Sequence, residues 1–345
     1  MNVTDSRYKN SVLVQEMLQT PQIIRGLDPG KIQSFSVNKQ KVLLAGEGSS
    51  RIFPAKNTIC NSLVPGYSQR IITENCMQAA EYDLSDYSVF VASNSGRTSE
   101  VIHLIRSLRE KGHSDITAVT GTRGTPVALE SSAAYILTCG AEQAVSANKS
   151  VMEQALFYDI LFRHINGEPP LDLELLADAM HQVLTMDIPQ EIVAMTAAAP
   201  VLYFSGRNNG VAEELALKTN EIVRKKSDYL EGTYAVHGVE EVMNKGEVVI
   251  LFDPFESQEE KIRSVIVEGA GLSVIAVSER ETVFPTIRIP HIYGCAPYLQ
   301  LAIGWNLLVE AGIASGINPD CPVRARKIGN EFTGLTNHEP ELKNS

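Results

Sequence analysis

The sequence predicts an α/β protein made of two tandem doubly wound units, each built on a parallel β-sheet. Short strand-like runs alternate with amphipathic helical segments, which is the pattern of βαβ units. The strand-like runs are continuously apolar, as in strands that helices cover on both faces. The pattern also occurs twice, because Val42 and Val89 have counterparts in Val201 and Val248, each 159 residues later.

Four pairs of strands and one pair of helices define this repeat. We expect a helix over 98–112 and its counterpart over 257–271, each with a hydroxyl N-cap, acidic residues in its first turn and a glycine at its end. The expected strands of the first unit and their counterparts in the second are 41–46 and 200–206, 88–92 and 247–252, 116–120 and 274–278, and 135–137 and 287–289.

The chain divides into four predicted parts. In chain order these are an N-terminal helical arm (1–30), a first unit (31–168), a second unit (169–325) and a C-terminal tail (326–345). In the arm, apolar spacing indicates a helix over 8–25 that breaks at Pro21 and packs on the first unit. The second unit opens with a helical stretch over about 171–186.

Composition restricts the partners that the chain can have. The net charge of −11 over 345 residues repels nucleic acid and anionic membranes, so we expect neither, and a phosphate site must rely on local hydrogen-bond donors. The five cysteines are scattered without a C-x-x-C pair, which argues against a disulfide framework and a zinc site. A polar N-terminus and the lack of an apolar run of about 18 residues predict a cytoplasmic protein without a signal peptide or membrane span.

A hydroxyl-rich loop follows the second strand, at the sheet edge where parallel α/β proteins bind ligands. This loop, 93–98, combines three hydroxyls and a glycine with the start of a helix, which suits an anion. The alternative is a turn that only caps the helix. The counterpart, 253–257, carries carboxylates, and capping alone would not require that contrast. We therefore assign a phosphate site to the first unit only.

Two other polar loops are candidates for the same site. The loop 46–51 carries Ser49 and Ser50 beside the phosphate loop, and Arg51 stands where a dinucleotide-binding G-x-G-x-x-G motif has its third glycine, which disfavours a nucleotide. The loop 140–149 opens a long apolar helix. It is either a third wall of the site or a plain helix start.

Candidates for proton transfer lie in the second unit. Glu214, Lys218 and Glu221 fall at i, i+4 and i+7 of a predicted helix and therefore share one face. A row of surface salt bridges is the alternative to a catalytic role. His237 follows after a loop, and a lone histidine is more often structural than catalytic, although histidine and glutamate both suit proton transfer at neutral pH.

With these motifs the chain resembles the sugar isomerase (SIS) domain family, whose units are flavodoxin-like αβα sandwiches. The resemblance runs from about Tyr8 to Gly334, and it is to the isomerase half of glucosamine-6-phosphate synthase and its stand-alone relatives in particular. The segments that carry it are Gly46-Glu-Gly-Ser-Ser50, Ser93-Asn-Ser-Gly-Arg-Thr98, Ala144-Val-Ser-Ala-Asn-Lys149, Ala216-Leu-Lys-Thr-Asn-Glu221 and Asn318-Pro-Asp-Cys-Pro322.

The resemblance implies a role for each matching residue. Glu221 would move a proton between C1 and C2 of a sugar, and Lys327 would bind the open-chain carbonyl. His237 would open the sugar ring from the partner subunit, which implies a homodimer with sites at the subunit interface. The residues that would bind the phosphosugar are Gly48, Ser49, Ser50, Ser93, Asn94, Ser95, Thr98, Val145 and Ala147.

The sequence departs from the family pattern at three places. The segment Tyr234-Ala-Val-His-Gly-Val239 replaces the synthase's Glu-Leu-Lys-His-Gly-Pro around the histidine. Lys327 aligns only loosely with the family's active-site lysine, because a second basic residue, Arg326, is adjacent to it. No segment resembles a glutaminase domain, so we expect no release of ammonia from glutamine.

These observations predict a phosphosugar aldose–ketose isomerase or an amino-sugar-phosphate deaminase of the glucosamine 6-phosphate and fructose 6-phosphate type. Both reactions need ring opening and a C1–C2 proton shift. We expect no metal or organic cofactor, because the carbonyl or imine already acidifies the proton. Two alternatives remain, a fructosyl-amine 6-phosphate deglycase with a bulkier leaving amine, and a non-catalytic phosphosugar sensor.

Overall fold

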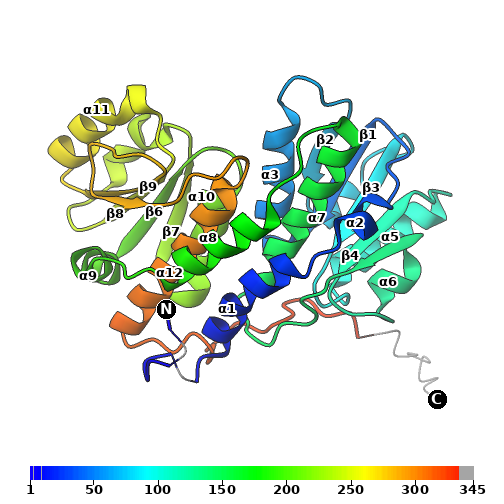
Figure 1. Cartoon of the computed structure of the whole chain (residues 1–345), viewed down its shortest axis with the longest axis horizontal. Coiled ribbons are helices and arrows are strands. Elements are labelled where there is room, and N and C mark those ends of the chain that lie inside the picture. Colours follow the sequence, from blue (N-terminus) through cyan, green and yellow to red (C-terminus); the bar gives the residue numbers. More distant parts are fainter. Residues whose placement is uncertain (3, 9, 334–345) are drawn as a thin grey trace, which may run out of the picture.

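The structure, a computed structural model, describes residues 1–2, 4–8 and 10–333, and it contains two five-stranded parallel sheets side by side (Figure 1). The strand order is β2-β1-β3-β4-β5 in the first sheet and β7-β6-β8-β9-β10 in the second. The two orders are the same, which confirms the predicted doubly wound α/β class and the internal repeat.

Eight of the ten strands were expected from the sequence, apart from shifts of one or two residues at their ends. The strands of the first sheet are β1 Lys41–Gly46, β2 Arg70–Glu74, β3 Tyr87–Ala92, β4 Ile116–Thr120 and β5 Ala133–Ile136. Those of the second sheet are β6 Val201–Gly206, β7 Lys226–Glu231, β8 Val248–Phe252, β9 Ser273–Ser278 and β10 Thr286–Arg288. The strands β2 and β7 were not expected, because each begins with a basic residue and ends with a glutamate, has one buried residue, and lacks a continuous apolar run.

Helices cover both faces of each sheet. The chain's α-helices are α1 Val12–Arg25, α2 Pro29–Gln33, α3 Ile52–Ser62, α4 Cys76–Ala79, α5 Ser99–Glu110, α6 Pro126–Glu130, α7 Lys149–Asn166, α8 Leu173–Thr185, α9 Gln190–Ala198, α10 Val211–Ile222, α11 Glu259–Ile262 and α12 Ala296–Ala314. Among the described residues, no helix is long and apolar enough to cross a bilayer.

One large apolar core joins the two units. It lies between the sheets, where α3 packs on α7, α10 packs on both α3 and α12, and α12 packs on α8 (Figure 1). The helices α7 and α12 are buried on nearly every side, as helices at the centre of a large protein are. Two smaller apolar clusters lie on the outer faces of the sheets.

The N-terminal helix differs from the expected arm. The helix α1 continues through Pro21, although a proline inside a helix removes one backbone hydrogen bond. It packs on both α8 and α7, and the N-terminal ammonium of Met1 donates to the carbonyl of Leu184. The expectation of a break at Pro21 was therefore wrong, because burial of the apolar face holds the helix together, and α1 packs on the second unit as well as on the first.

The expected helix over 257–271 was also only partly correct. This segment is a short 3-10 turn, then α11, then a π-helical stretch over Arg263–Gly269. No serine or threonine side chain caps it. The two units are thus more alike in their strands than in their outer helices.

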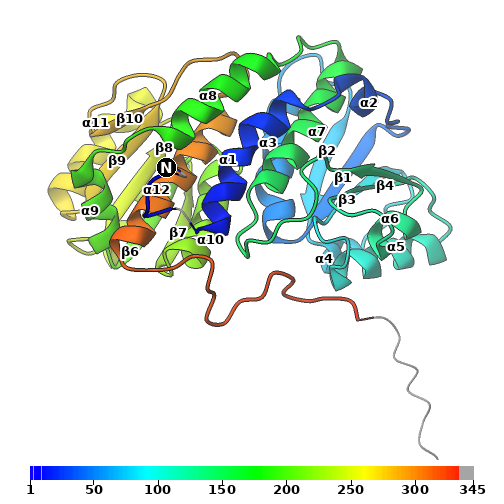
Figure 2. The same cartoon turned by 60° about the horizontal axis from the view of Figure 1, so that its bottom comes forward.

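An extended segment after α12 connects the two units on the outside. Residues 315–333, here called the strap, run from the second unit across to the first (Figure 2). The guanidinium of Arg224 donates to the carbonyls of Asn318 and Cys321. At the far end, the amide of Phe332 donates to the carbonyl of Arg97, next to the predicted phosphate loop. The rest of the predicted tail, 334–345, lies outside the described residues.

A buried ion pair ties the core helices of the two units together. Arg163 of α7 donates to Asp159 on the same helix at 2.6 Å, and the hydroxyl of Tyr298 on α12 donates to the other carboxylate oxygen at 2.8 Å. The side chain of Asp159 is 0% exposed and that of Arg163 9%. Removing one partner of such a pair leaves the other charge buried without compensation.

We therefore predict that Asp159→Ala lowers the free energy of unfolding by about 3–5 kcal/mol, because Arg163 stays buried without a carboxylate. Urea unfolding followed by circular dichroism measures this. The control is Asp86→Ala, which removes the exposed partner of Lys41 and should cost about 0–1 kcal/mol. Equal losses in the two variants would contradict the role given to the buried pair.

Candidate functional site

A cavity of about 420 Å³ opens at the carboxyl ends of β1 and β3, where parallel sheets bind ligands. It brings together the three predicted loops, the helix α10 and the strap. Every residue to which the family resemblance assigns a role lines it, except His237, whereas the other two candidates on α10, Glu214 and Lys218, do not. The lining residues are Glu47, Gly48, Ser49, Ser50, Ala92, Ser93, Asn94, Ser95, Thr98, Glu100, Val145, Ala147, Glu221, Lys327, Ile328, Gly329 and Asn330.

The hydroxyls of the loop 93–98 form hydrogen bonds within the loop, since Ser93 accepts from the amide of Gly96 at 3.1 Å and Ser95 from the amide of Arg97 at 3.2 Å. Thr98 is the N-cap residue of α5, yet its side chain accepts no capping hydrogen bond and instead lies 2.9 Å from the hydroxyl of Ser93. Gly96 has φ +65°, and a Cβ there would lie 2.1 Å from Oγ1 of Thr125, so only glycine fits. The side chain of Thr98 therefore does not cap α5, in contrast to the alternative of a turn that only caps the helix.

The equivalent place in the second unit is filled by protein. The guanidinium of Arg207 lies 3.8 Å from the ring centre of Phe255 and 3.2 Å from a carboxylate oxygen of Asp253. An arginine, an aromatic ring and a carboxylate thus occupy the position that hydroxyls line in the first unit. This contrast agrees with an anion site in the first unit alone.

Lys218 of α10 is fully buried and connects the two units at the cavity. Its ammonium donates to the hydroxyl of Ser49 at 2.7 Å and to the carboxylate of Glu221 at 2.9 Å, and it lies 3.4 Å from Glu214. The side chains of Lys218 and Glu214 are both 0% exposed. The row of residues on α10 is therefore no surface salt-bridge row, because the helix face that they share points into the protein.

The charges of this group depend on one another. Burial alone lowers the pKa of Lys218, but the carboxylates of Glu221 and Glu214 outweigh burial, so its pKa lies above the usual value. Burial raises the pKa of Glu214, and the ammonium of Lys218 opposes this only in part. Lys218 consequently stays charged beside Glu221.

Glu221 is the member of the row that reaches the cavity. One of its carboxylate oxygens accepts hydrogen bonds from Lys218 at 2.9 Å and from the hydroxyl of Ser146 at 2.8 Å. Its side chain is 26% exposed. The carboxylate is thus held at one oxygen, while the side chain remains accessible from the cavity that the phosphate loop also lines. A carboxylate placed in this way can accept and return a proton.

Lys327 reaches the cavity from the strap. Its ammonium donates to the buried carboxylate of Glu142 at 3.1 Å. Glu142 in turn accepts hydrogen bonds from the amides of Asn148 and Ser150 at the start of α7, both at 2.9 Å. The loop 140–149 is therefore more than a helix start, since it supplies Ser146 to Glu221 and Glu142 to Lys327.

Two carboxylates lie close to the hydroxyl loop. Burial raises the pKa of Glu47, whose carboxylate accepts a hydrogen bond from the amide of Cys76 at 2.8 Å. Glu100 of α5 accepts one from the side-chain amide of Asn330 on the strap, also at 2.8 Å. Lys218 and Lys327 are already paired with Glu221 and Glu142, so these two carboxylates add negative charge to the lining of the cavity.

His237 lies apart from the cavity. It is exposed, and its ring nitrogen lies 3.3 Å from the hydroxyl of Thr233. Tyr234 and Val242 nearby expose 59% and 68% of their surface. The structure of one chain therefore does not bring His237 together with Glu221.

Sequence reasoning missed several side chains of the site. It named Lys218 only as one of a row, and it assigned no role to Ser146, Glu142 or the strap residues 328–330. The i, i+4, i+7 spacing indicated a shared helix face. That the face is buried could not be seen locally, because Lys218 contacts Ser49, which lies 169 residues earlier in the sequence.

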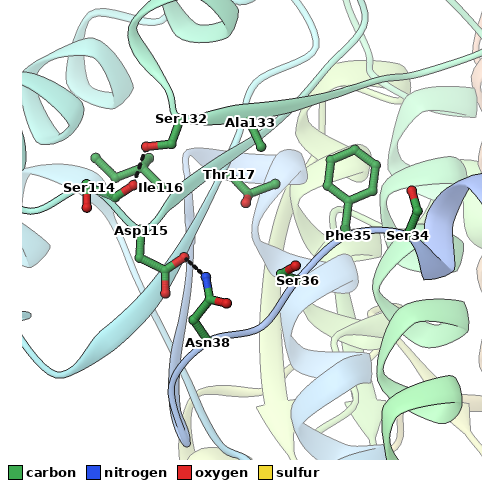
Figure 3. Close-up of a pocket in the computed structure, with 10 residues that line it drawn as sticks. All are labelled: Ser34, Phe35, Ser36, Asn38, Ser114, Asp115, Ile116, Thr117, Ser132 and Ala133. Atoms are coloured by element: carbon green, nitrogen blue, oxygen red, sulfur yellow. Dashed lines mark hydrogen bonds between the residues drawn. The ribbon is translucent and has the colours of Figure 1, made fainter.

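Another cavity, of about 350 Å³, lies at the opposite end of the first sheet (Figure 3). It is lined by the residues before β1 and by the amino ends of β4 and β5, where Asp115 accepts hydrogen bonds from Ser88 and Asn38. Because the amino ends of the strands line it, it is separate from the edge that binds ligands in parallel sheets.

The chain has relatives among known sequences. No model of a known protein family matches the chain. A glutamine–fructose-6-phosphate aminotransferase (isomerizing) of Oceanobacillus iheyensis is 27% identical over 270 residues, which are 72% of this chain and 44% of that protein. The protein of the same name from Streptomyces coelicolor is 28% identical over 59% of this chain and 37% of that protein. The chain thus spans less than half of the length of these relatives.

Solved structures share the fold over nearly the whole chain. A tagatose-6-phosphate ketose/aldose isomerase of Escherichia coli has a TM-score of 0.75 at 16% identity, covering 93% of this chain and 99% of that one. A glucosamine-6-phosphate deaminase of Thermotoga maritima has a TM-score of 0.74 at 20% identity, with 93% and 99% covered. The C-terminal domain of a glucosamine-fructose-6-phosphate aminotransferase of Francisella tularensis has 0.73 at 16% identity, with 91% and 98% covered. The chain therefore shares the fold of these structures and, at 27–28% identity, resembles part of the glutamine–fructose-6-phosphate aminotransferases, in agreement with the resemblance to the SIS domain family that its motifs indicate.

Proposed function

We propose that the chain is a phosphosugar aldose–ketose isomerase or an amino-sugar-phosphate deaminase that acts on hexose 6-phosphates. The observation that carries this proposal is the placement of Glu221, which lines the same cavity as the loop 93–98. Its relatives support the reaction class, since their names include isomerases and a deaminase of phosphosugars. The reaction needs no metal or organic cofactor.

In this proposal the phosphate and the reacting carbons are held by different units. The hydroxyls of Ser93, Ser95 and Thr98, with the N-terminus of α5, bind the phosphate. Binding energy from the phosphate then fixes the open-chain sugar against Glu221. Glu221 removes a proton from C1 or C2 and returns it to the neighbouring carbon through an enediol or enolamine. Lys327 binds the carbonyl oxygen.

We further propose that the active form is a cytoplasmic homodimer in which the partner subunit supplies a histidine for ring opening. The exposed position of His237, beside the exposed apolar side chains of Tyr234 and Val242, supports a subunit contact there. A histidine suits ring opening because it can both accept and donate a proton near neutral pH.

A deglycase is the second candidate. In this reaction Glu221 moves a proton from C1 to C2 of a fructosyl-amine 6-phosphate, which turns the C1 amine into an imine. Water then adds to the imine carbon, and the amine leaves with the formation of glucose 6-phosphate. A second cavity that also contacts Glu221, described below, favours this candidate because it offers room for a substituted amine.

We predict that Glu221→Gln reduces kcat by about 10²–10⁴-fold, the usual contribution of a general base, and leaves the affinity for the phosphosugar nearly unchanged. Assays with glucosamine 6-phosphate, with fructose 6-phosphate plus ammonia and with fructosyl-amine 6-phosphates measure it. The control is Glu191→Gln on α9, an exposed carboxylate of the same unit. Unchanged turnover in Glu221→Gln would refute the assignment, and tight binding without turnover in the unmodified protein would indicate a sensor.

A second prediction concerns the phosphate loop. Thr98→Val removes a hydroxyl but keeps the shape of the side chain, so KM for a hexose 6-phosphate should rise about 10–100-fold, as expected for one hydrogen bond to a charged group. The matched control is Ser257→Ala, at the corresponding position of the second unit, which should leave KM unchanged. The phosphate site is misplaced if both variants behave alike in steady-state kinetics.

A further inference from the structure

A cavity of about 600 Å³, here called the second cavity and distinct from the one in Figure 3, adjoins the proposed phosphosugar site. The two cavities share Glu221 and Val145 in their linings, whereas no residue of the loop 93–98 lines the second one. The second cavity therefore extends from Glu221 away from the phosphate loop. A sugar phosphate anchored at that loop, with its carbonyl carbons at Glu221, would point its carbonyl end toward this space.

The second cavity carries a concentration of positive charge. Four of its twelve lining residues are basic, namely Arg224, Lys225, Lys226 and Arg324. Its one acidic residue is Glu221, which already pairs with the buried ammonium of Lys218. Since the chain as a whole has 30 basic and 41 acidic side chains, this lining has the opposite sign to the rest of the molecule.

None of these four basic side chains pairs with a carboxylate among the described residues. Arg224 donates to backbone carbonyls of the strap, and Lys225 donates to the carbonyl of Ala199 at 2.7 Å. The side chains of Lys226 and Arg324 form no hydrogen bond or ion pair with the residues that the structure describes. Their charges are therefore available to an anion.

The wall opposite α10 is apolar and is held in place. Pro319, Pro322 and Val323 of the strap line it. Arg224 attaches this part of the strap to the end of α10, and it does so from a backbone conformation, φ +55°, that is unusual for a residue other than glycine. A cavity with an apolar wall and basic side chains suits a group that has both carbon chain and negative charge.

We propose that this cavity is a subsite for a carboxylate-bearing amine attached at the carbonyl end of the sugar phosphate. The inference rests on the proposed phosphosugar function and makes it more specific, because ammonia or a hydroxyl group would use neither the volume nor the charge. A phosphate on C1 is a second source of negative charge. The carboxylate-bearing amine is favoured because the apolar wall and the volume of about 600 Å³ exceed what a phosphate would fill.

The test uses unreactive ligands, so that binding is measured without turnover. Reductive amination of glucose 6-phosphate gives 1-amino-1-deoxyglucitol 6-phosphates with any chosen amine. We compare the conjugate of glutamate, which has two carboxylates, with the conjugate of glutamate diamide, which has the same shape and no carboxylate. Glucitol 6-phosphate and glucitol 1,6-bisphosphate complete the set, and isothermal titration calorimetry gives each Kd.

The glutamate conjugate should bind about tenfold more tightly than the diamide conjugate, and the difference should shrink as salt is raised. In the double variant Lys226→Gln with Arg324→Gln, the two conjugates should bind within about twofold of each other, with the Kd of glucitol 6-phosphate unchanged. The matched control is Lys245→Gln with Lys261→Gln, two exposed lysines outside the cavity, and it should keep the tenfold preference.

Three results would overturn the proposal in distinguishable ways. Equal binding of the two conjugates to the unmodified protein, with glucitol 6-phosphate still bound, would remove the carboxylate subsite and leave the proposed function intact. Equal binding of the conjugates together with tighter binding of glucitol 1,6-bisphosphate would assign the cavity to a second phosphate. Failure of all four ligands to bind would overturn the phosphosugar site itself.

Discussion

The buried ammonium of Lys218 is the constraint on which the candidate site depends. A charge in the interior must be paired, and removing one partner of a buried pair usually costs several kcal/mol. The partners of Lys218 come from both halves of the chain, the hydroxyl of Ser49 from the first and the carboxylates of Glu214 and Glu221 from the second. The loop after β1 and the helix α10 must therefore meet, and Glu221 reaches the edge of the phosphate loop as a consequence.

The two units share a strand order but have diverged at the corresponding loops. The first unit keeps hydroxyls after β3, while the second places Arg207 between Phe255 and Asp253 at the same position. The second unit instead contributes the carboxylate of Glu221. A repeated fold thus supplies two different parts of one cavity, a group of hydroxyls and a carboxylate, and each part is held by its own sheet. The strap then adds Lys327 from the end of the described chain.

The fold class and most of the residues that line the cavity could be predicted from the sequence. Strands such as β3 and β8 are buried on both faces, so their apolar runs are visible without a structure. The edge strands β2 and β7 have no such pattern. The loop residues Ser93 and Thr98 were predictable, because the carboxyl ends of neighbouring parallel strands always share one edge of a sheet.

Features that depend on distant parts of the chain could not be predicted. The spacing of Glu214, Lys218 and Glu221 shows that they share a helix face, but only tertiary packing decides that this face is buried. The basic lining of the second cavity joins the end of α10 to residues about a hundred positions later on the strap. Pro21 lies inside a continuous helix because its surroundings compensate for the lost hydrogen bond, which a local rule cannot foresee.

In the function that we propose, a carboxylate of the second unit exchanges a proton on a sugar anchored by the first. Proton NMR in D₂O tests it most directly, with each hexose 6-phosphate or its amine conjugate that binds the protein. We expect the protein to catalyse exchange of one of the two C1 hydrogens of the ketose form for deuterium, even where no net product accumulates. A saturating ligand whose C1 hydrogens stay unexchanged over many hours would contradict it.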